Sequence, residues 1–154
     1  MALTINTPAP DFRLPSTAGS DFQLSEALRG KALILYFYPK DFTPLCTVET
    51  CIFRDTFEFF NNLGVAVVGI STDDLETHHR FIEAHNIPFP LLADVDGRVA
   101  SSYDAFDPLI KFTRRITYLI DGQGMIRAVY ANVFKDEKDL RKMIESLQKE
   151  SQAL

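Results

Sequence analysis

The sequence predicts an α/β domain in which helices flank a mixed β-sheet, and three observations carry this prediction. Residues 33–38 and 65–70 are continuous β-favouring apolar runs, and the segment between them has helical spacing. Residues 116–120 and 125–130 are two further β-favouring runs, separated only by a short turn. The chain has 154 residues, 46% hydrophobic and 24% charged, an ordinary balance for one compact domain. The predicted order is therefore strand–helix–strand, then strand–strand–helix.

The first half of the chain predicts a parallel crossover unit. The run at 33–38 is apolar throughout and stops at Pro39, which is typical of a strand buried on both faces. Residues 46–63 contain neither Gly nor Pro and are followed by Gly64, a usual helix-ending residue. We therefore expect one helix over 46–63, joining parallel strands at 33–38 and 65–70.

The second half predicts a further helix, a hairpin and a last helix. Asp73 and Glu76 have the spacing of a capping box, so a helix should run from there to about His85. A turn at 121–124 should close the hairpin. The remaining signals predict a short extended segment at 89–93, a short helix at 97–103, and a last amphipathic helix with Leu140, Ile144 and Leu147 on one side. Together these elements predict a thioredoxin-like fold with an N-terminal extension, as a single domain over 1–154.

Charge and hydropathy exclude several classes of protein. The formal charge is −5 and the pI is about 5.1. Nonspecific phosphate binding needs a basic face, so a nucleic acid is not an expected partner. The longest apolar stretch, 32–38, is far shorter than the roughly 20 residues that cross a bilayer, and the N-terminus lacks the features of a secretory signal. We expect a soluble cytoplasmic protein that does not bind a membrane, although an organelle-targeting peptide removed earlier would leave no trace here.

Cys46 and Cys51 are the only cysteines in the sequence. One bridge across so short a loop would constrain little of the unfolded chain, so a disulfide scaffold is excluded. Two cysteines without a neighbouring Cys or His pair also make a poor zinc site. A redox or catalytic role remains, against the alternative of two buried thiols that act as small hydrophobic residues.

The position of Cys46 favours a reactive thiolate. It follows a proline-bounded loop, residues 39–44, and opens the predicted helix. Free backbone N–H groups and the helix dipole stabilise an anion at that end. Thr43, three residues earlier, can offer its hydroxyl to the sulfur or to a bound oxygen atom.

Cys51 lies five residues after Cys46, not three as in a Cys-x-x-Cys redox motif. In an intact helix the two Cα atoms would lie roughly 8–9 Å apart, with the side chains pointing about 140° away from each other. A disulfide needs a Cα separation below about 7 Å. The two thiols can therefore bond only if at least the first turn of the helix unwinds. That arrangement suits a cycle in which Cys46 reacts first and local unfolding then brings in Cys51.

These residues resemble a known family. Residues 39–46, Pro-Lys-Asp-Phe-Thr-Pro-Leu-Cys, match the Pro-x-x-x-Thr-x-x-Cys signature of peroxiredoxins. The stretch 36–55 resembles the peroxiredoxin Q subfamily, also called bacterioferritin comigratory protein, some members of which carry a second cysteine at this offset. Residues 115–121, Arg-Ile-Thr-Tyr-Leu-Ile-Asp, resemble the arginine strand of that family. The resemblance extends from residue 9 to about residue 130.

The resemblance implies a thiol peroxidase that reduces hydrogen peroxide and small organic hydroperoxides without metal, haem or flavin. Cys46 would be the peroxidatic cysteine, which attacks the peroxide and becomes a sulfenic acid. Thr43 would hold the peroxide and the sulfur. Arg115 would stabilise the thiolate and the charge on the leaving oxygen. Pro39 would shield the site from water, and Glu49 would help to orient an arginine.

In the same scheme Cys51 would be the resolving cysteine, giving an intramolecular disulfide that thioredoxin or a similar dithiol reduces. Members of the subfamily are often monomeric, so a monomer, or at most a weak dimer, is expected. Leu45 stands where the subfamily usually has Gly, which makes the pocket rim more apolar and the loop less free. Adjacent strand residues face opposite ways, so only one of Arg114 and Arg115 should enter the pocket, and the motif favours Arg115.

Two other functions stay open. One is a thioredoxin-like disulfide oxidoreductase, although its Cys-x-x-Cys spacing is absent. The other is a non-catalytic binding module of the same fold, in which both cysteines serve packing.

A metal site is not expected. His78, His79 and His85 lack the four-residue spacing of a helical ligand pair, and we expect them at or near the surface. Asp94 and Asp96 resemble part of a calcium loop, but the closing Glu is absent.

Overall fold

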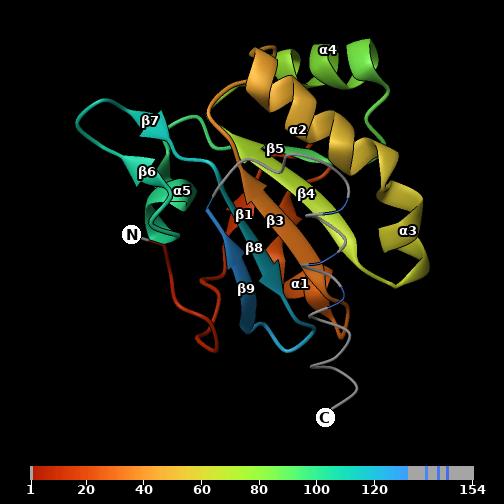
Figure 1. The fold of residues 1–154 in the computed structure, drawn as a ribbon. Helices are drawn as coiled ribbons and strands as arrows, with labels where there is room; N and C mark the ends of the chain where they lie inside the picture. The colour runs from red at the N-terminus through yellow and green to blue at the C-terminus, as the bar shows by residue number, and fades with distance from the viewer. Residues whose placement is uncertain (1, 132–137, 139–141, 143–144, 146–154) are drawn as a thin grey trace.

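The computed structural model describes residues 2–131, 138, 142 and 145. Its centre is a five-stranded sheet with the order β5-β4-β3-β8-β9, which runs through the middle of the molecule in Figure 1. The strands are β1 (Arg13–Leu14), β2 (Phe22–Gln23), β3 (Leu33–Phe37), β4 (Ala66–Ser71), β5 (Leu91–Ala93), β6 (Phe106–Asp107), β7 (Phe112–Thr113), β8 (Ile116–Ile120) and β9 (Ile126–Tyr130). The helices are α1 (Leu24–Leu28), α2 (Pro44–Asp55), α3 (Phe57–Asn62), α4 (Leu75–His85) and α5 (Arg98–Ser102).

Strand β3 lies at the centre of the sheet because it is apolar on both faces. It pairs in parallel with β4 and antiparallel with β8. Leu33, Leu35 and Phe37 point into a core shared with α1 and α5. Ile34 and Tyr36 point into a second core, shared with α2, α3 and α4. The predicted α/β class, the parallel crossover and the hairpin of β8 and β9 are therefore confirmed.

The single helix predicted over residues 46–63 is wrong, because Thr56 separates α2 from α3. Thr56 has φ −101° and ψ 4°, outside the helical geometry. Its hydroxyl donates to the Ile52 carbonyl oxygen at 2.7 Å, and such bonds back to the preceding turn bend helices. Gly64 follows the second helix with φ +74°, the left-handed conformation expected of a helix-ending glycine.

The start of α4 also differs from the expectation. The capping residue is Asp74, which accepts a hydrogen bond from the Thr77 backbone N–H at 2.8 Å. Asp73, the predicted cap, instead accepts hydrogen bonds from the Asp41 N–H and the Ser71 hydroxyl. Two neighbouring aspartates therefore have separate roles: one caps α4 and the other binds the loop that follows β3.

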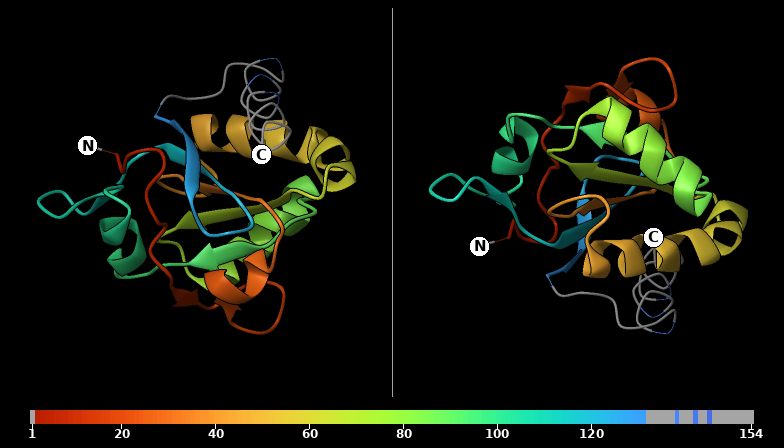
Figure 2. Two further views of the ribbon diagram at one scale, coloured as in Figure 1. Left: turned by 90° about the horizontal axis from the view of Figure 1, so that it is seen from below. Right: turned by 90° about the horizontal axis from the view of Figure 1, so that it is seen from above.

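The remaining elements agree with the predictions in part. β5 and α5 lie within the predicted segments 89–93 and 97–103. The hairpin of β6 and β7, which projects from the body of the molecule (Figure 2), has no counterpart among the predicted elements. The last predicted helix, with Leu140, Ile144 and Leu147, lies outside the described residues, and the single domain over 1–154 stays a prediction. None of the described helices is long and apolar enough to cross a membrane.

Gly69 of β4 leaves room for the ring of Tyr36 on the neighbouring strand. A Cβ at this position would lie 2.8 Å from Tyr36 Cζ and 2.8 Å from Leu91 Cδ2, closer than packed side chains approach. We expect Gly69→Ala to lower the free energy of unfolding by about 1–3 kcal/mol through overpacking, measured by urea denaturation. An unchanged midpoint would show that the tyrosine ring moves aside without cost.

Candidate active site

The loop after β3 brings Cys46 into the first turn of α2. Phe42 in this loop has φ +65°, a left-handed conformation that bulky residues rarely adopt and that is often found at functional sites. Thr43 is the N-cap residue, and Pro44 takes the first helical position, where a missing N–H costs nothing. The Thr43 side chain makes no capping hydrogen bond to this end of α2. The N–H groups of its first turn and its dipole therefore remain available to an anion at Cys46.

Both cysteines are free thiols within α2. Cys46 is 0% exposed and packs with Tyr36 and Tyr38, whereas Cys51 is partly exposed. The helix is continuous between them, and the two thiols are not at disulfide distance. A bond between them therefore requires unwinding of α2, as their spacing predicts. An inert core thiol would be buried in the same way. The assignment of Cys46 as a reactive thiol therefore depends more on the polar groups around it.

A buried glutamate of α2 lies close to a partly buried arginine. Glu49 is 1% exposed and follows Cys46 by three residues, so both side chains project from one face of the helix. Arg115, just before β8, places its Nη1 3.9 Å from Glu49 Oε1. That Nη1 atom is buried and has no hydrogen-bond partner within the described part of the chain, an arrangement that costs free energy until an acceptor arrives. The neighbouring Arg114 is exposed, so the geometry agrees with the choice of Arg115.

The loop residues present an engaged hydroxyl and exposed apolar side chains. Thr43 donates its hydroxyl to the Lys40 carbonyl oxygen at 2.8 Å, so its oxygen can accept a hydrogen bond from another group. Pro39 is partly buried at the start of the loop. Three apolar residues flank Cys46 in the chain with about half of each exposed: Phe42, Leu45 and Val48. Leu45 is therefore exposed, and its place on the rim of a substrate pocket stays a prediction.

Comparison with known proteins distinguishes among the three functions that the sequence left open, a thiol peroxidase, a disulfide oxidoreductase and a non-catalytic binding module. Residues 5–129 match the model of the AhpC/TSA family. This chain belongs to that family. A putative peroxiredoxin bcp of Coxiella burnetii is 42% identical over 142 residues, which cover 88% of this chain and 93% of that protein. A chloroplastic peroxiredoxin Q of Sedum lineare is 37% identical over 147 residues, or 95% of this chain and 78% of the relative.

A solved structure agrees with this membership. The crystal structure of peroxidoxin BcpB from Mycobacterium tuberculosis superposes with a TM-score of 0.86 at 31% identity, over 94% of this chain and 96% of that one. The resemblance to peroxiredoxin Q and the thioredoxin-like fold are thus confirmed, and the protein is a thiol peroxidase. The roles of single residues, the number of subunits and the cellular compartment stay predictions.

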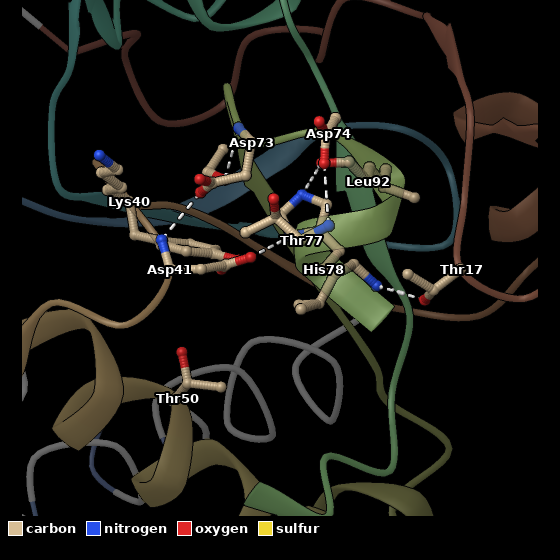
Figure 3. Close-up of polar contacts among 12 residues, drawn as sticks. Thr17, Lys40, Asp41, Thr50, Asp73, Asp74, Thr77, His78 and Leu92 are labelled. Atoms are coloured by element: carbon tan, nitrogen blue, oxygen red, sulfur yellow. Dashed lines mark hydrogen bonds and ion pairs between the residues drawn. The ribbon is translucent and has the colours of Figure 1, made fainter. Parts of the chain in front are cut away.

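The sequence did not reveal a buried polar group beside the cysteine loop of this peroxiredoxin. His78, expected near the surface, is 0% exposed, so that expectation is wrong. Its Nδ1 lies 2.6 Å from Asp41 Oδ2, and its Nε2 lies 2.9 Å from the Leu92 carbonyl oxygen (Figure 3). Tyr38 donates its hydroxyl to Asp41 Oδ1 at 2.6 Å. One signal was present: His78 precedes Phe81 by three residues and so shares the apolar face of α4.

Two tyrosines of this core remain neutral. Burial raises the pKa of both Tyr36 and Tyr38 well above the ordinary value, and the negative charge of Asp41 adds to the rise. Tyr38 therefore keeps the proton that it donates to Asp41. The hydroxyl oxygens of Tyr36 and Thr50 lie 3.0 Å apart, which joins β3 to α2 one turn after Cys46. The Tyr36 hydroxyl thus attaches to the cysteine helix, and the Tyr38 hydroxyl attaches to the loop before it.

Proposed function

We propose that Cys46 is the peroxidatic cysteine and Cys51 the resolving cysteine of this thiol peroxidase. One observation supports this most: Cys46 lies in the first turn of α2, whose N-cap residue Thr43 makes no side-chain capping bond. Glu49, three residues later, lies near a buried Arg115 Nη1 that lacks a hydrogen-bond partner in the described structure. A helix N-terminus and a guanidinium are both groups that stabilise a thiolate and a developing oxyanion. Glu49 orients the guanidinium by its position 3.9 Å away.

The first step oxidises Cys46. Its thiolate attacks the terminal peroxide oxygen, so an S–O bond forms as the O–O bond breaks, and the electron pair leaves with the other oxygen. That oxygen takes up a proton and departs as water or an alcohol, while Cys46 becomes a sulfenic acid. Thr43 accepts a hydrogen bond from the peroxide O–H, because its own proton is held by Lys40. Arg115 donates to the oxygen on which charge develops.

The second step forms the disulfide. The Cys51 thiolate attacks the Cys46 sulfur, the S–S bond forms, and the S–O bond breaks with loss of water after protonation. The first turns of α2 must unwind for this step, because the intact helix keeps the thiols apart. A dithiol of the thioredoxin type then reduces the disulfide and restores both thiols.

The substrates that we propose are hydrogen peroxide and small organic hydroperoxides. The apolar rim of Phe42, Leu45 and Val48 offers a surface for the organic group of a hydroperoxide. Pro39 limits access of water to the loop. The proposed cycle uses only the two thiols and an external dithiol, and it needs one copy of the chain.

The experiment identifies which cysteine is oxidised, and to which product, in the first turnover. The reduced chain receives one equivalent of hydrogen peroxide, and the products are identified by peptide mass analysis. We expect a Cys46–Cys51 disulfide in the native chain and, with dimedone present, a sulfenic acid adduct at Cys46 in Cys51→Ser. The matched chain is Cys46→Ser: a sulfenic acid adduct at Cys51 there, with none at Cys46 in Cys51→Ser, would exchange the two roles. Reduction of added disulfides without any peroxide consumption would favour a disulfide oxidoreductase.

A further inference from the structure

Asp41 is held in the loop between β3 and α2 by three separate groups, together called the Asp41 anchor below. Tyr38 donates to Asp41 Oδ1 at 2.6 Å and His78 lies 2.6 Å from Oδ2. The Asp41 backbone N–H donates to Asp73 Oδ2 at 2.8 Å (Figure 3), and the Ser71 hydroxyl donates to the same oxygen at 2.6 Å. The side chains of Asp41 and His78 are both 0% exposed. A fully bonded buried network of this kind holds a backbone segment in one conformation.

The positions of the protons in this network follow from its acceptors. The Leu92 carbonyl oxygen can only accept, so His78 Nε2, 2.9 Å away, carries a hydrogen. His78 Nδ1 and Asp41 Oδ2 then share one proton between them, whichever atom holds it. β5 thus fixes the imidazole from one side, and the imidazole fixes the cysteine loop on the other. Loss of the Nδ1 contact would leave a buried carboxylate oxygen without this partner, which is costly.

Helix α4 contacts both ends of the segment that carries the two cysteines. At the front end, His78 in α4 binds Asp41, and Phe42 packs edge-on against Phe81 with ring centroids 5.0 Å apart. At the far end, Arg54 Nη1 donates to the carbonyl oxygen of His85, the last residue of α4, at 2.9 Å. The residues that must unwind to join the cysteines therefore lie between two attachments to one helix.

We propose that His78 is a positioning residue for the reaction of the peroxidatic cysteine, a role that rests on the proposed functions of Cys46 and Cys51. Through Asp41 it holds the loop with Thr43 and Cys46 in the conformation that reacts with peroxide. The same contact opposes the unwound conformation in which Cys46 meets Cys51. Weakening the Asp41 anchor therefore slows the first step and speeds the second, because it shifts the population from the folded to the unwound loop.

The test uses two amides that each replace one ring nitrogen of His78. In His78→Asn the amide nitrogen lies near the position of Nδ1 and can donate to Asp41. In His78→Gln it reaches toward the position of Nε2 and can donate to the Leu92 carbonyl, but the contact with Asp41 is lost. The control is His79→Gln, an exposed residue next along the same helix. The two His78 variants share chemistry and burial, and each keeps one of the two contacts, so their difference reports whether the contact with Asp41 or that with Leu92 controls the rates.

Two rates are measured by rapid mixing on the full chain. The first is the second-order rate constant of Cys46 with hydrogen peroxide, taken in a Cys51→Ser background, and the second is the rate of disulfide formation with both cysteines present. For His78→Gln we expect the first to fall about tenfold, the size of a lost charge-assisted hydrogen bond, and the second to rise about threefold or more. His78→Asn and His79→Gln should stay within about twofold of the parent chain for both rates.

Equal behaviour of the Asn and Gln variants, or a fall of both rates together in His78→Gln, would overturn the proposal, since a general loss of stability does not raise one rate while lowering the other. If His78→Gln does not fold, Tyr38→Phe decides, because it removes only the hydroxyl bonded to Asp41 Oδ1 and should shift the two rates in the same opposite directions. No change in either rate there also refutes the inference. Failure of the proposed function has another signature: the parent chain itself would show no fast oxidation of Cys46.

Discussion

Replacement of Cys46 by serine should abolish peroxide turnover. A serine hydroxyl is not ionised at neutral pH and is a poor nucleophile toward peroxide oxygen, so none of the groups around position 46 can restore the reaction. We expect a loss of at least about a thousandfold, in line with removal of other catalytic nucleophiles. The measurement is consumption of hydrogen peroxide with a dithiol reductant in excess. The side chain is fully buried but nearly the same size, so the variant should still fold.

Cys51→Ser is the matched comparison, and its expected result differs in kind. Cys51 lies on the same helix but is partly exposed, so its replacement should disturb the packing of α2 no more than replacement of the buried Cys46. Without a resolving thiol the chain should consume about one equivalent of peroxide and then stop when thioredoxin is the only reductant, since its sulfenic acid has no partner. Retained turnover in Cys46→Ser would refute the assignment of the peroxidatic cysteine, and a normal cycle in Cys51→Ser would refute that of the resolving one.

The parts of the fold that the sequence predicts are those set by local pattern. The apolar runs that become β3, β4 and β8 are almost entirely buried on both faces. Their continuous β-favouring sequences therefore predict a strand without ambiguity. The break at Thr56 escaped prediction because helical spacing continues across it, and only the hydroxyl bonded to Ile52 interrupts the helix. The choice between Asp73 and Asp74 as the cap of α4 depends on Asp41, a residue more than thirty positions away in the chain.

The residues of the candidate site also fall into two groups, those that a local motif identifies and those that only the tertiary fold brings together. Cys46, Thr43 and Arg115 occur in motifs that local sequence displays, so they could be named before any coordinates. His78 could not, because histidine is compatible with both surface and core, and its partners, Asp41 and Leu92, meet it only through the tertiary fold. Spacing tests for metal ligands say nothing about a histidine that binds a carboxylate and a carbonyl oxygen.

Arg115→Ala should lower the second-order rate constant of Cys46 with hydrogen peroxide by about a hundredfold to a thousandfold, the usual cost of removing one preorganised donor to a developing oxyanion. The reason is geometric: its Nη1 atom is buried, lies 3.9 Å from Glu49, and makes no hydrogen bond within the described residues, so it is poised for an arriving oxygen. The rate is measured by rapid mixing in the Cys51→Ser background, where only the first step occurs.

Controls separate this role from a general need for positive charge. Arg114→Ala removes an exposed cation one position away and should change the rate by less than about twofold. Arg115→Lys keeps the charge but loses the planar guanidinium, so it should recover only part of the rate. If both arginine-to-alanine variants slowed the reaction equally, the effect would be long-range attraction of charge. The effect of both variants on the rate would then become much smaller with added salt. The effect of losing a buried donor at Arg115 should instead remain in high salt, because salt does not screen a contact that excludes water.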